Sequence, residues 1–298
     1  MKTSNHLLRR LTAALLAAVL ALSIALPVFA SDDGDTIYIN SVSDLLSLAG
    51  SCAYDQWSVG KTVILQKDLS LEGMLWEPIP SFSGQFKGNG HTISDLTITG
   101  QYSPAGLFGI VEEQGSIESL SVRGVVSVSD SADTTTGGIA GVNHGTLISC
   151  QFTGVVTGDS EVGGIVGRNE SEGTIDHSTA RAIVTGKSST GGIAGYNLGA
   201  ITGCTNVGSI NTEYPEASLD TDGFTAKMVD YINNKMAAAD DDATNSVTNV
   251  ATDTGGIAGR SSGMILTSVN TGTIGYEHVG YNVGGIVGRT DGLVSRSE

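Results

Sequence analysis

The sequence contains little proline, few charged residues and few aromatic residues. Of its 298 residues, 5 are proline, 15% are charged and 5% are aromatic. So little proline excludes collagen and a proline-rich stalk, and Lys, Glu and Leu are too sparse for a helical bundle. The 40% of hydrophobic residues is too high for a disordered chain. Glycine is abundant, with 41 residues, at about twice its ordinary usage. Composition therefore favours a glycine-rich β protein.

The N-terminus has the features of an export signal. Residues 1–30 contain three basic residues and no acid, an apolar run over 11–26 and the ending Val28-Phe29-Ala30. A basic start, an apolar middle and small residues before the cleavage site are typical of a secretory signal peptide. No stop-transfer charges follow, which argues against a transmembrane helix. We predict cleavage after Ala30 and a mature chain that is secreted or at the cell surface, with no membrane span.

The predicted mature chain is strongly acidic. Removing residues 1–30 leaves 12 basic and 31 acidic residues, a net charge of −19. Such a chain repels phosphates, so nucleic acid is excluded as a partner.

A glycine motif repeats through the chain. Gly-Gly-Ile-[Ala/Val]-Gly begins at Gly137, Gly163, Gly191, Gly255 and Gly284. The spacings are 26, 28, 64 and 29 residues, and the long one equals a repeat of 28 plus an insertion of 36. A degenerate copy begins at Ala105. A period of this length predicts a solenoid or another repeat architecture.

Each repeat contains three short segments whose aliphatic residues align into columns. The columns are Leu107, Ile139, Ile165, Ile193, Ile257 and Ile286; Ile117, Leu147, Ile175, Ile201, Ile265 and Val294; and Val126, Val156, Val184, Ile210 and Ile274. β-Branched segments between glycine or polar turns are typical of strands joined at corners. We therefore predict an all-β fold, a single-stranded parallel β-helix solenoid of right-handed sense with three strands per turn. A propeller or sandwich is the alternative, but propeller blades need about 40 residues each.

The chain is expected to have three parts. They are the signal peptide at 1–30, an N-terminal cap with the first coils at 31–104, and repeats at 105–298. In the cap, Ser41-Val42-Ser43-Asp44 resembles a capping box and predicts a helix over 43–49 that covers the strand edges of the first coil. Strands are predicted at 36–39, 62–65 and 91–98.

The insertion, at about 212–253, breaks the repeat pattern. Apolar residues at helical spacing from Phe224 to Met236, after a possible N-cap at Asp222, predict a helix of two to three turns. We expect this helix to lie against the outside of the solenoid. The acidic run 240–242 predicts a solvated loop rather than a metal site.

The repeats resemble the GLUG family, which includes surface and adhesin-like proteins and some IgA-specific proteases. The resemblance rests on the Gly-Gly-Ile blocks, on Gly106-Leu107-Phe108-Gly109, on the leader from Phe82 to Ile93, and on Trp76-Glu77-Pro78-Ile79. It covers roughly residues 60–298 and implies a β-helical fold. Such scaffolds carry different activities. No His-Glu-x-x-His occurs in the sequence, so the zinc-protease activity of some members is not transferred.

Carboxylates are the first candidates for chemistry, because β-helical enzymes that act on polysaccharides use acids on neighbouring coils. Five acids lie close in sequence: Asp159, Glu161, Glu170, Glu172 and Asp176. The equivalent positions of adjacent repeats are mostly Ser, Thr or Gly. We therefore predict ordinary surface charge here and no catalytic residues.

Histidine and asparagine give no metal or cofactor motif. The mature histidines His91, His144, His177 and His278 are not spaced as a metal pair, and calcium-binding glycine nonapeptides are absent. Asn143, Asn169 and Asn197 align after three motif blocks. We expect an amide ladder that hydrogen-bonds turn backbones, with ligand binding as the alternative.

Two cysteines share one column of the repeat. Cys150 and Cys204 align with each other, and Ser178 lies in the coil between them. Two coils span about 9.6 Å, beyond the limit of about 7 Å between Cα atoms of bridged cysteines. We predict that they are small buried residues and unbonded, and Cys52 has no evident partner.

The functional expectation has two classes. The favoured one is a non-enzymatic, adhesin-like scaffold that presents loops to glycans or proteins of a host or neighbouring cell. The alternative is a polysaccharide lyase or hydrolase. The sequence stops at Glu298 within a repeat, so we expect a fragment of a longer protein.

Overall fold

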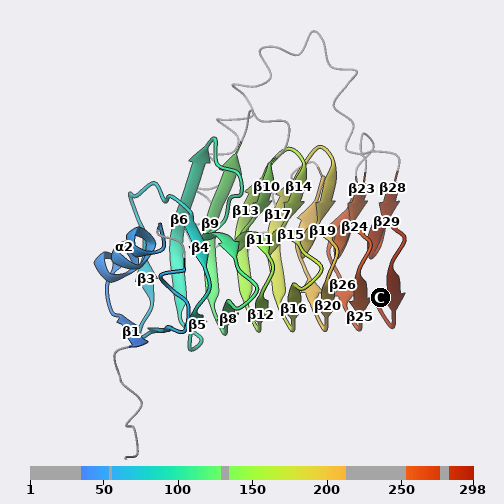
Figure 1. The fold of residues 1–298 in the computed structure, drawn as a ribbon. Helices are drawn as coiled ribbons and strands as arrows, with labels where there is room; N and C mark the ends of the chain where they lie inside the picture. The colour runs from blue at the N-terminus through green and yellow to red at the C-terminus, as the bar shows by residue number, and fades with distance from the viewer. Residues whose placement is uncertain (1–34, 54–55, 129–133, 213–252, 276–281) are drawn as a thin grey trace, which may run out of the picture. The chain divides into compact units, whose positions relative to one another are not determined.

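The computed structural model describes residues 35–53, 56–128, 134–212, 253–275 and 282–298. From Thr36 onward they form one unit built almost entirely of short parallel strands (Figure 1). Each regular coil passes through four sheets in the same order, which we name sheets I to IV. Successive coils therefore add successive strands to each sheet, as expected of a β-helix.

The strands of each sheet are given in stacking order. Sheet I contains β10 (Thr135–Gly137), β14 (Glu161–Gly163), β18 (Ser189–Gly191), β23 (Asp253–Gly255) and β28 (Asn282–Gly284). Sheet II contains β4 (Ile79–Phe82), β7 (Phe108–Val111), β11 (Ala140–Asn143), β15 (Val166–Asn169), β19 (Ala194–Asn197), β24 (Ala258–Ser261) and β29 (Val287–Thr290). Sheet III contains β1 (Thr36–Ile39), β2 (Thr62–Leu65), β5 (Gln85–Lys87), β8 (Ser116–Glu118), β12 (Thr146–Ile148), β16 (Thr174–Asp176), β20 (Ala200–Thr202), β25 (Met264–Leu266) and β30 (Leu293–Ser295). Sheet IV contains β3 (Leu69–Ser70), β6 (Thr92–Gly100), β9 (Ser121–Val128), β13 (Gln151–Thr157), β17 (Thr179–Thr185), β21 (Thr205–Asn206) with β22 (Ser209–Ile210), and β26 (Val269–Asn270) with β27 (Thr273–Ile274).

The aliphatic columns form the core. In sheet III, Leu147 pairs with Ile175, and Ile175 pairs with Ile201. In sheet IV, Val156 pairs with Val184. These residues are fully buried, so each column is an internal ladder with one side chain from each coil. The parallel β-helix predicted from the sequence is confirmed.

The prediction of three strands per turn is wrong, because regular coils have four. The additional strand lies in sheet I and has three residues, of which the central one is buried, as at Thr136, Val162 and Thr190. The column that includes Ile193 lies at the bend between sheets I and II. There the Ile193 N–H still donates to the Ile257 carbonyl at 2.9 Å. The coil-to-coil ladder therefore continues through the bend.

The motif glycines are required by close approach of the backbone. In the block that starts at Gly191, a Cβ on Gly191 would overlap the Ala194 carbonyl of its own coil. A Cβ on Gly192 would overlap the Gly256 carbonyl of the next coil, and one on Gly195 would overlap the sheet I backbone at Val162. The repeated motif is therefore a packing motif, which lets strands of sheets I and II lie against each other without side chains between them.

One corner has a left-handed backbone in successive coils. Between sheets III and IV, Ser149, His177 and Thr267 have φ of 52°, 45° and 48°, and Gly203 occupies the same corner with φ of 60°. The residue after each corner points inward, and in the coil of His177 it is Ser178. This arrangement turns the chain sharply enough to bury a side chain directly after an exposed one.

The N-terminal end of the stack is covered by a helix. Helix α2 (Val42–Ser51) begins one residue before and ends two residues after the predicted range. The Ser41 hydroxyl accepts the Asp44 N–H at 3.2 Å, as the capping box predicts. Leu45 and Leu48 are buried, and the helix packs against β1 and β4 (Figure 1). The helix therefore covers an end of the stack that would otherwise expose strand edges.

Several predictions fall outside the described residues. They concern the signal peptide, the helix from Phe224 to Met236, the acidic run 240–242 and His278. Among the described residues, no helix has the length and apolar content needed to cross a membrane.

Candidate functional site

The asparagine column is a buried ladder. Asn143 Nδ2 donates to Asn169 Oδ1 at 2.7 Å, and Asn169 Nδ2 donates to Asn197 Oδ1 at 2.8 Å. Asn197 continues to the Ser261 hydroxyl at 3.0 Å. The amides also donate to turn carbonyls, including Gly173 at 3.1 Å. All three asparagines are fully buried, so the predicted structural ladder is confirmed and their side chains are not available to an external ligand.

A second amide pair was not predicted. Asn206 Nδ2 donates to Asn270 Oδ1 at 2.7 Å, in the stack that holds Phe152 and Ala180 in earlier coils. Asn206 Oδ1 also accepts the Gly208 N–H, and Asn270 Oδ1 accepts the Gly272 N–H. Here the insertion separates the two repeats in sequence, so the pairing is visible only when the coils are aligned across it.

Replacing Asn169 by Asp should destabilise the chain in a pH-dependent way. The carboxylate keeps the shape of the amide but cannot donate to Asn197 or Gly173, and it is buried. We expect a loss of about 2 kcal/mol at pH 7. Burial raises the folded pKa of the new carboxyl above its unfolded value of about 3.9. The variant therefore loses the full amount of unfolding free energy at pH values above the folded pKa, and this loss becomes smaller as the pH falls to about 4.

Urea unfolding of wild type and the Asn169→Asp variant at pH 7 and pH 4 measures this effect. The gap in unfolding free energy should shrink at pH 4, because the protonated carboxyl can donate again. A gap of equal size at both pH values would contradict the buried ladder.

The cysteine column is also structural. The Ser178 hydroxyl accepts the Cys150 N–H at 3.1 Å, and Cys204 Sγ accepts the Ser178 N–H at 3.5 Å. Cys52, Cys150 and Cys204 are buried and free, so the prediction that Cys150 and Cys204 are unbonded is confirmed. Burial raises the pKa of the Cys52 thiol to about 11 and that of each of the other two to about 12. All three are therefore unreactive as thiolates near neutral pH.

Two of the five candidate acids are brought together by an arginine. Arg168 Nη1 lies 2.7 Å from Glu161 Oε1, and its Nε lies 2.6 Å from Glu170 Oε1. Burial alone would lower the pKa of Arg168, but the two carboxylates outweigh it and raise that pKa. Arg168 and Arg260 each lie 5.0 Å from the ring centroid of Tyr196. This network spans three coils, and sequence reasoning missed it.

The remaining three acids have separate partners. Asp159 lies 2.6 Å from Lys187 Nζ, and Asp176 lies 2.9 Å from the Nδ1 of His177. Glu172 accepts the Ser171 hydroxyl, which lowers the pKa of its carboxyl. The five acids therefore do not converge on one site.

The described histidines do not form a metal site either. His91 Nδ1 lies 3.2 Å from Asp68, which also accepts the Thr92 N–H, and this backbone hydrogen bond lowers the pKa of Asp68. Within the described ranges, no group of three or more His, Cys, Asp or Glu side chains is arranged to hold a metal ion.

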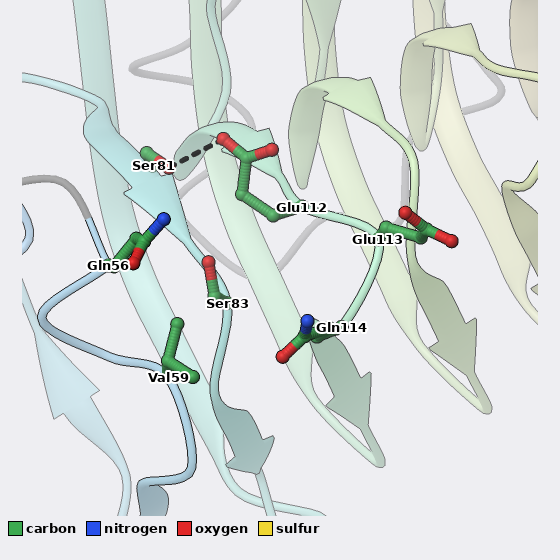
Figure 2. A pocket seen from close by; sticks show the side chains of 7 residues that line it. All are labelled: Gln56, Val59, Ser81, Ser83, Glu112, Glu113 and Gln114. Carbon is green, nitrogen blue, oxygen red and sulfur yellow. Dashed lines mark hydrogen bonds between the residues drawn. The ribbon is translucent and has the colours of Figure 1, made fainter.

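A polar pocket lies at the N-terminal end of the repeats, beside the corner between sheets II and III. Its volume is about 390 Å³. Figure 2 shows its seven lining side chains, which are Gln56, Val59, Ser81, Ser83, Glu112, Glu113 and Gln114. The Ser81 hydroxyl donates to Glu112 Oε1 at 2.6 Å. The three segments that line it are distant in sequence, so no sequence motif indicated this site.

Comparisons with known proteins agree with the repeat architecture. Residues 158–185 match the family model described as the GLUG motif. This match spans one complete coil, from the turn before β14 to the end of β17.

Two relatives share part of the sequence. Halomucin of Haloquadratum walsbyi is 32% identical over 48% of this chain and 2% of its own length. A "Putative Gly-rich membrane protein" of Evansella cellulosilytica is 29% identical over 33% of this chain and 16% of its own length. The chain therefore spans a small part of either relative.

A solved structure has the same fold. The crystal structure of a "putative immunoglobulin A1 protease" from Bacteroides ovatus superimposes with a TM-score of 0.61, covering 88% of this chain and 74% of that one, at 17% identity. At this identity the likeness concerns the fold alone. The matched GLUG coil, the GLUG-like blocks in successive coils and the halomucin relative support an assignment to the GLUG-repeat family.

Proposed function

We propose that the chain is a non-enzymatic, adhesin-like scaffold that is exported, displayed at the cell surface and used to hold loops toward glycans or proteins of a host or neighbouring cell. The signal-like N-terminus supports export. The relative named as a membrane protein supports a location at the cell surface.

The observation that carries this proposal is the constancy of the stack. Ala200 pairs with Met264 and Ile201 with Ile265, in the same register as in earlier coils, although the insertion lies between them. The core thus stays fixed while corners and insertions vary. A rigid solenoid with variable loops is an arrangement that commonly serves binding.

The charged groups described above fit this role better than catalysis. Glu161 and Glu170 both accept from Arg168, and Asp159 is paired with Lys187. Carboxylates held as acceptors in ion pairs are poorly placed to donate or remove a proton from a sugar. They are better suited to fixing the outer surface of the coils.

A polysaccharide-cleaving enzyme is the second candidate, and one observation favours it. Glu112 and Glu113 line the same pocket. No Arg or Lys is among the lining residues, however, and Glu112 already accepts the Ser81 hydroxyl. Sugar cleavage by paired acids needs one of them as a proton donor, and nothing in this pocket marks either glutamate as one.

Two measurements test the proposed function. N-terminal sequencing of secreted material should begin at Ser31, and intact Met1 in a cytoplasmic fraction would contradict export. Incubation with pectins, alginates and glycosaminoglycans should leave the lengths of these polysaccharides unchanged. The fluorescently labelled protein should bind host or neighbouring cells. Cleavage of a polysaccharide, or the absence of cell binding, would overturn the scaffold proposal.

A further inference from the structure

The pocket beside the cap is a built feature of the fold. Its walls come from the cap loop at 56–59, residues 81–83 at the end of β4 and just after it, and the turn after β7 at 112–114 (Figure 2). The cap thus meets the first repeats here, and each wall contributes at least two side chains. A volume of about 390 Å³ lies in the range of small-molecule sites.

Hydrogen bonds hold the three walls in place. The buried Ser58 hydroxyl accepts the Ser83 N–H at 2.8 Å, which fixes the cap loop against β4. The Glu112 N–H donates to the Phe82 carbonyl at 2.9 Å, and the Ser81 hydroxyl donates to the Glu112 carboxylate. The walls are therefore positioned before any ligand arrives, which lowers the entropy lost on binding.

One wall also carries backbone strain. Gln56 has a φ of 63°, a left-handed conformation that is uncommon outside glycine and costs on the order of 1 kcal/mol. In Figure 2 the Gln56 side chain lies beside Ser81 and Ser83.

The lining chemistry suits a sugar. Two carboxylates accept hydrogen bonds, two carboxamides donate and accept them, and two hydroxyls do both. Adjacent hydroxyls of a sugar ring offer donors and acceptors in alternation, which this set can satisfy. Val59, 42% exposed, is the apolar contact for the C–H face of a ring. A peptide would instead need apolar side-chain pockets or a free strand edge.

The charge of the pocket restricts the sugar. Glu112 and Glu113 are acidic and no lining residue is basic, in a chain that is acidic overall. Carboxylated or sulfated sugars would be repelled. We propose that this pocket binds a residue of an uncharged or amine-bearing glycan without cleaving it. The inference rests on the proposed scaffold function and names its ligand class.

Binding of defined oligosaccharides to the secreted chain tests the inference. The probes are the cellulose, mannan and N-acetylglucosamine tetramers, the glucosamine tetramer, and trigalacturonate as the anionic comparison, measured by saturation-transfer NMR and calorimetry. At least one of the first four should bind and trigalacturonate should not. Glu112→Gln and Gln114→Ala should each weaken binding by about tenfold. Glu118→Gln, in the same coil but outside the pocket, should not change it.

The outcomes separate the inference from the scaffold proposal. Absence of binding by all four probes, equal binding of trigalacturonate, or affinities unchanged by the Glu112 and Gln114 variants would overturn the sugar pocket. If no probe binds while a variant that carries both Glu112→Gln and Gln114→Ala still binds cells as the wild type does, the scaffold proposal stands and the pocket inference falls. Cleavage of any probe by the wild-type chain would overturn both. Melting temperatures equal to wild type establish that the variants are folded.

Discussion

Replacing Ile193 by Asp should remove most of the stability of the chain. Ile193 is fully buried at the bend between sheets I and II, with Ile165 and Ile257 stacked on either side. Loss of a buried aliphatic side chain alone costs about 2 to 5 kcal/mol. The unpaired carboxylate adds a desolvation penalty, so we expect a loss of about 5 kcal/mol or more, comparable with the whole stability of many domains.

Val207→Asp is the matched control, because Val207, which lies between β21 and β22, is 40% exposed. Urea unfolding followed by circular dichroism should place this control within about 0.5 kcal/mol of wild type. If the Ile193→Asp chain does not fold, Ile193→Val provides a graded measurement, with an expected loss of about 1 kcal/mol. Equal stability of the Ile193→Asp and Val207→Asp variants would show that the inward face is wrongly assigned.

Replacing Gly192 by Ala should cost about 3 kcal/mol, the upper part of the usual range for overpacking. The added methyl group would overlap the Gly256 carbonyl and lie 2.6 Å from Asn206 Oδ1. It would therefore push apart two coils and disturb the Asn206 to Asn270 amide pair. Neither the carbonyl nor the hydrogen-bonded amide can move without breaking contacts between coils.

Gly285 supplies the control at the same position of the motif. Among the described residues, a Cβ there meets no atom within 4 Å, so Gly285→Ala should leave stability unchanged within about 0.5 kcal/mol. Chemical denaturation of both variants gives the comparison. If both alanines cost the same, close packing between coils is not what requires glycine at this position of the motif.

Much of the fold could be predicted because repetition makes each position visible several times. The sequence aligns Val126, Val156 and Val184 in one column, and in the structure Val156 pairs with Val126 on one side and with Val184 on the other. The cysteine column was also placed correctly, since Cys150 and Cys204 each contact Ser178 between them. Aligned repeats thus carry information on contacts that a single strand pattern lacks.

The fourth strand could not be predicted because it is short and weakly patterned. Strand β18, for example, has only three residues, Ser189–Gly191. A segment of three residues is too short to show an alternation of apolar and polar residues. The left-handed corner was equally hidden, because Ser149 and Thr267 have no intrinsic preference for that conformation. Both features depend on packing between coils.

The candidate site was beyond sequence reasoning for a different reason. Gln56, Ser81 and Glu112 belong to three segments and have ordinary polar side chains. They lie close together because of the way the cap packs against the first repeats. Aligning the repeats with one another gives no information on that packing. The link between Arg168 and Glu161 was missed similarly, because the acids were compared only with equivalent positions in other repeats.

The repeats form one uninterrupted stack, with one coil per repeat, across the insertion. Distances between spin labels on the outer face of sheet III test this arrangement directly. The labels are attached to cysteines introduced in pairs, at Gln85 with Ala200 and at Gln85 with Met264. Gln85 and Ala200 are four strand steps apart, and Met264 pairs with Ala200 one step further. The native thiols are buried and should not take up label.

With about 4.8 Å per step, we expect a separation of about 19 Å for Gln85 with Ala200 and about 24 Å for Gln85 with Met264. We predict that the second distance exceeds the first by a single strand spacing. A difference of about 10 Å, two spacings, would show that the insertion adds a coil of its own and would contradict the unbroken stack.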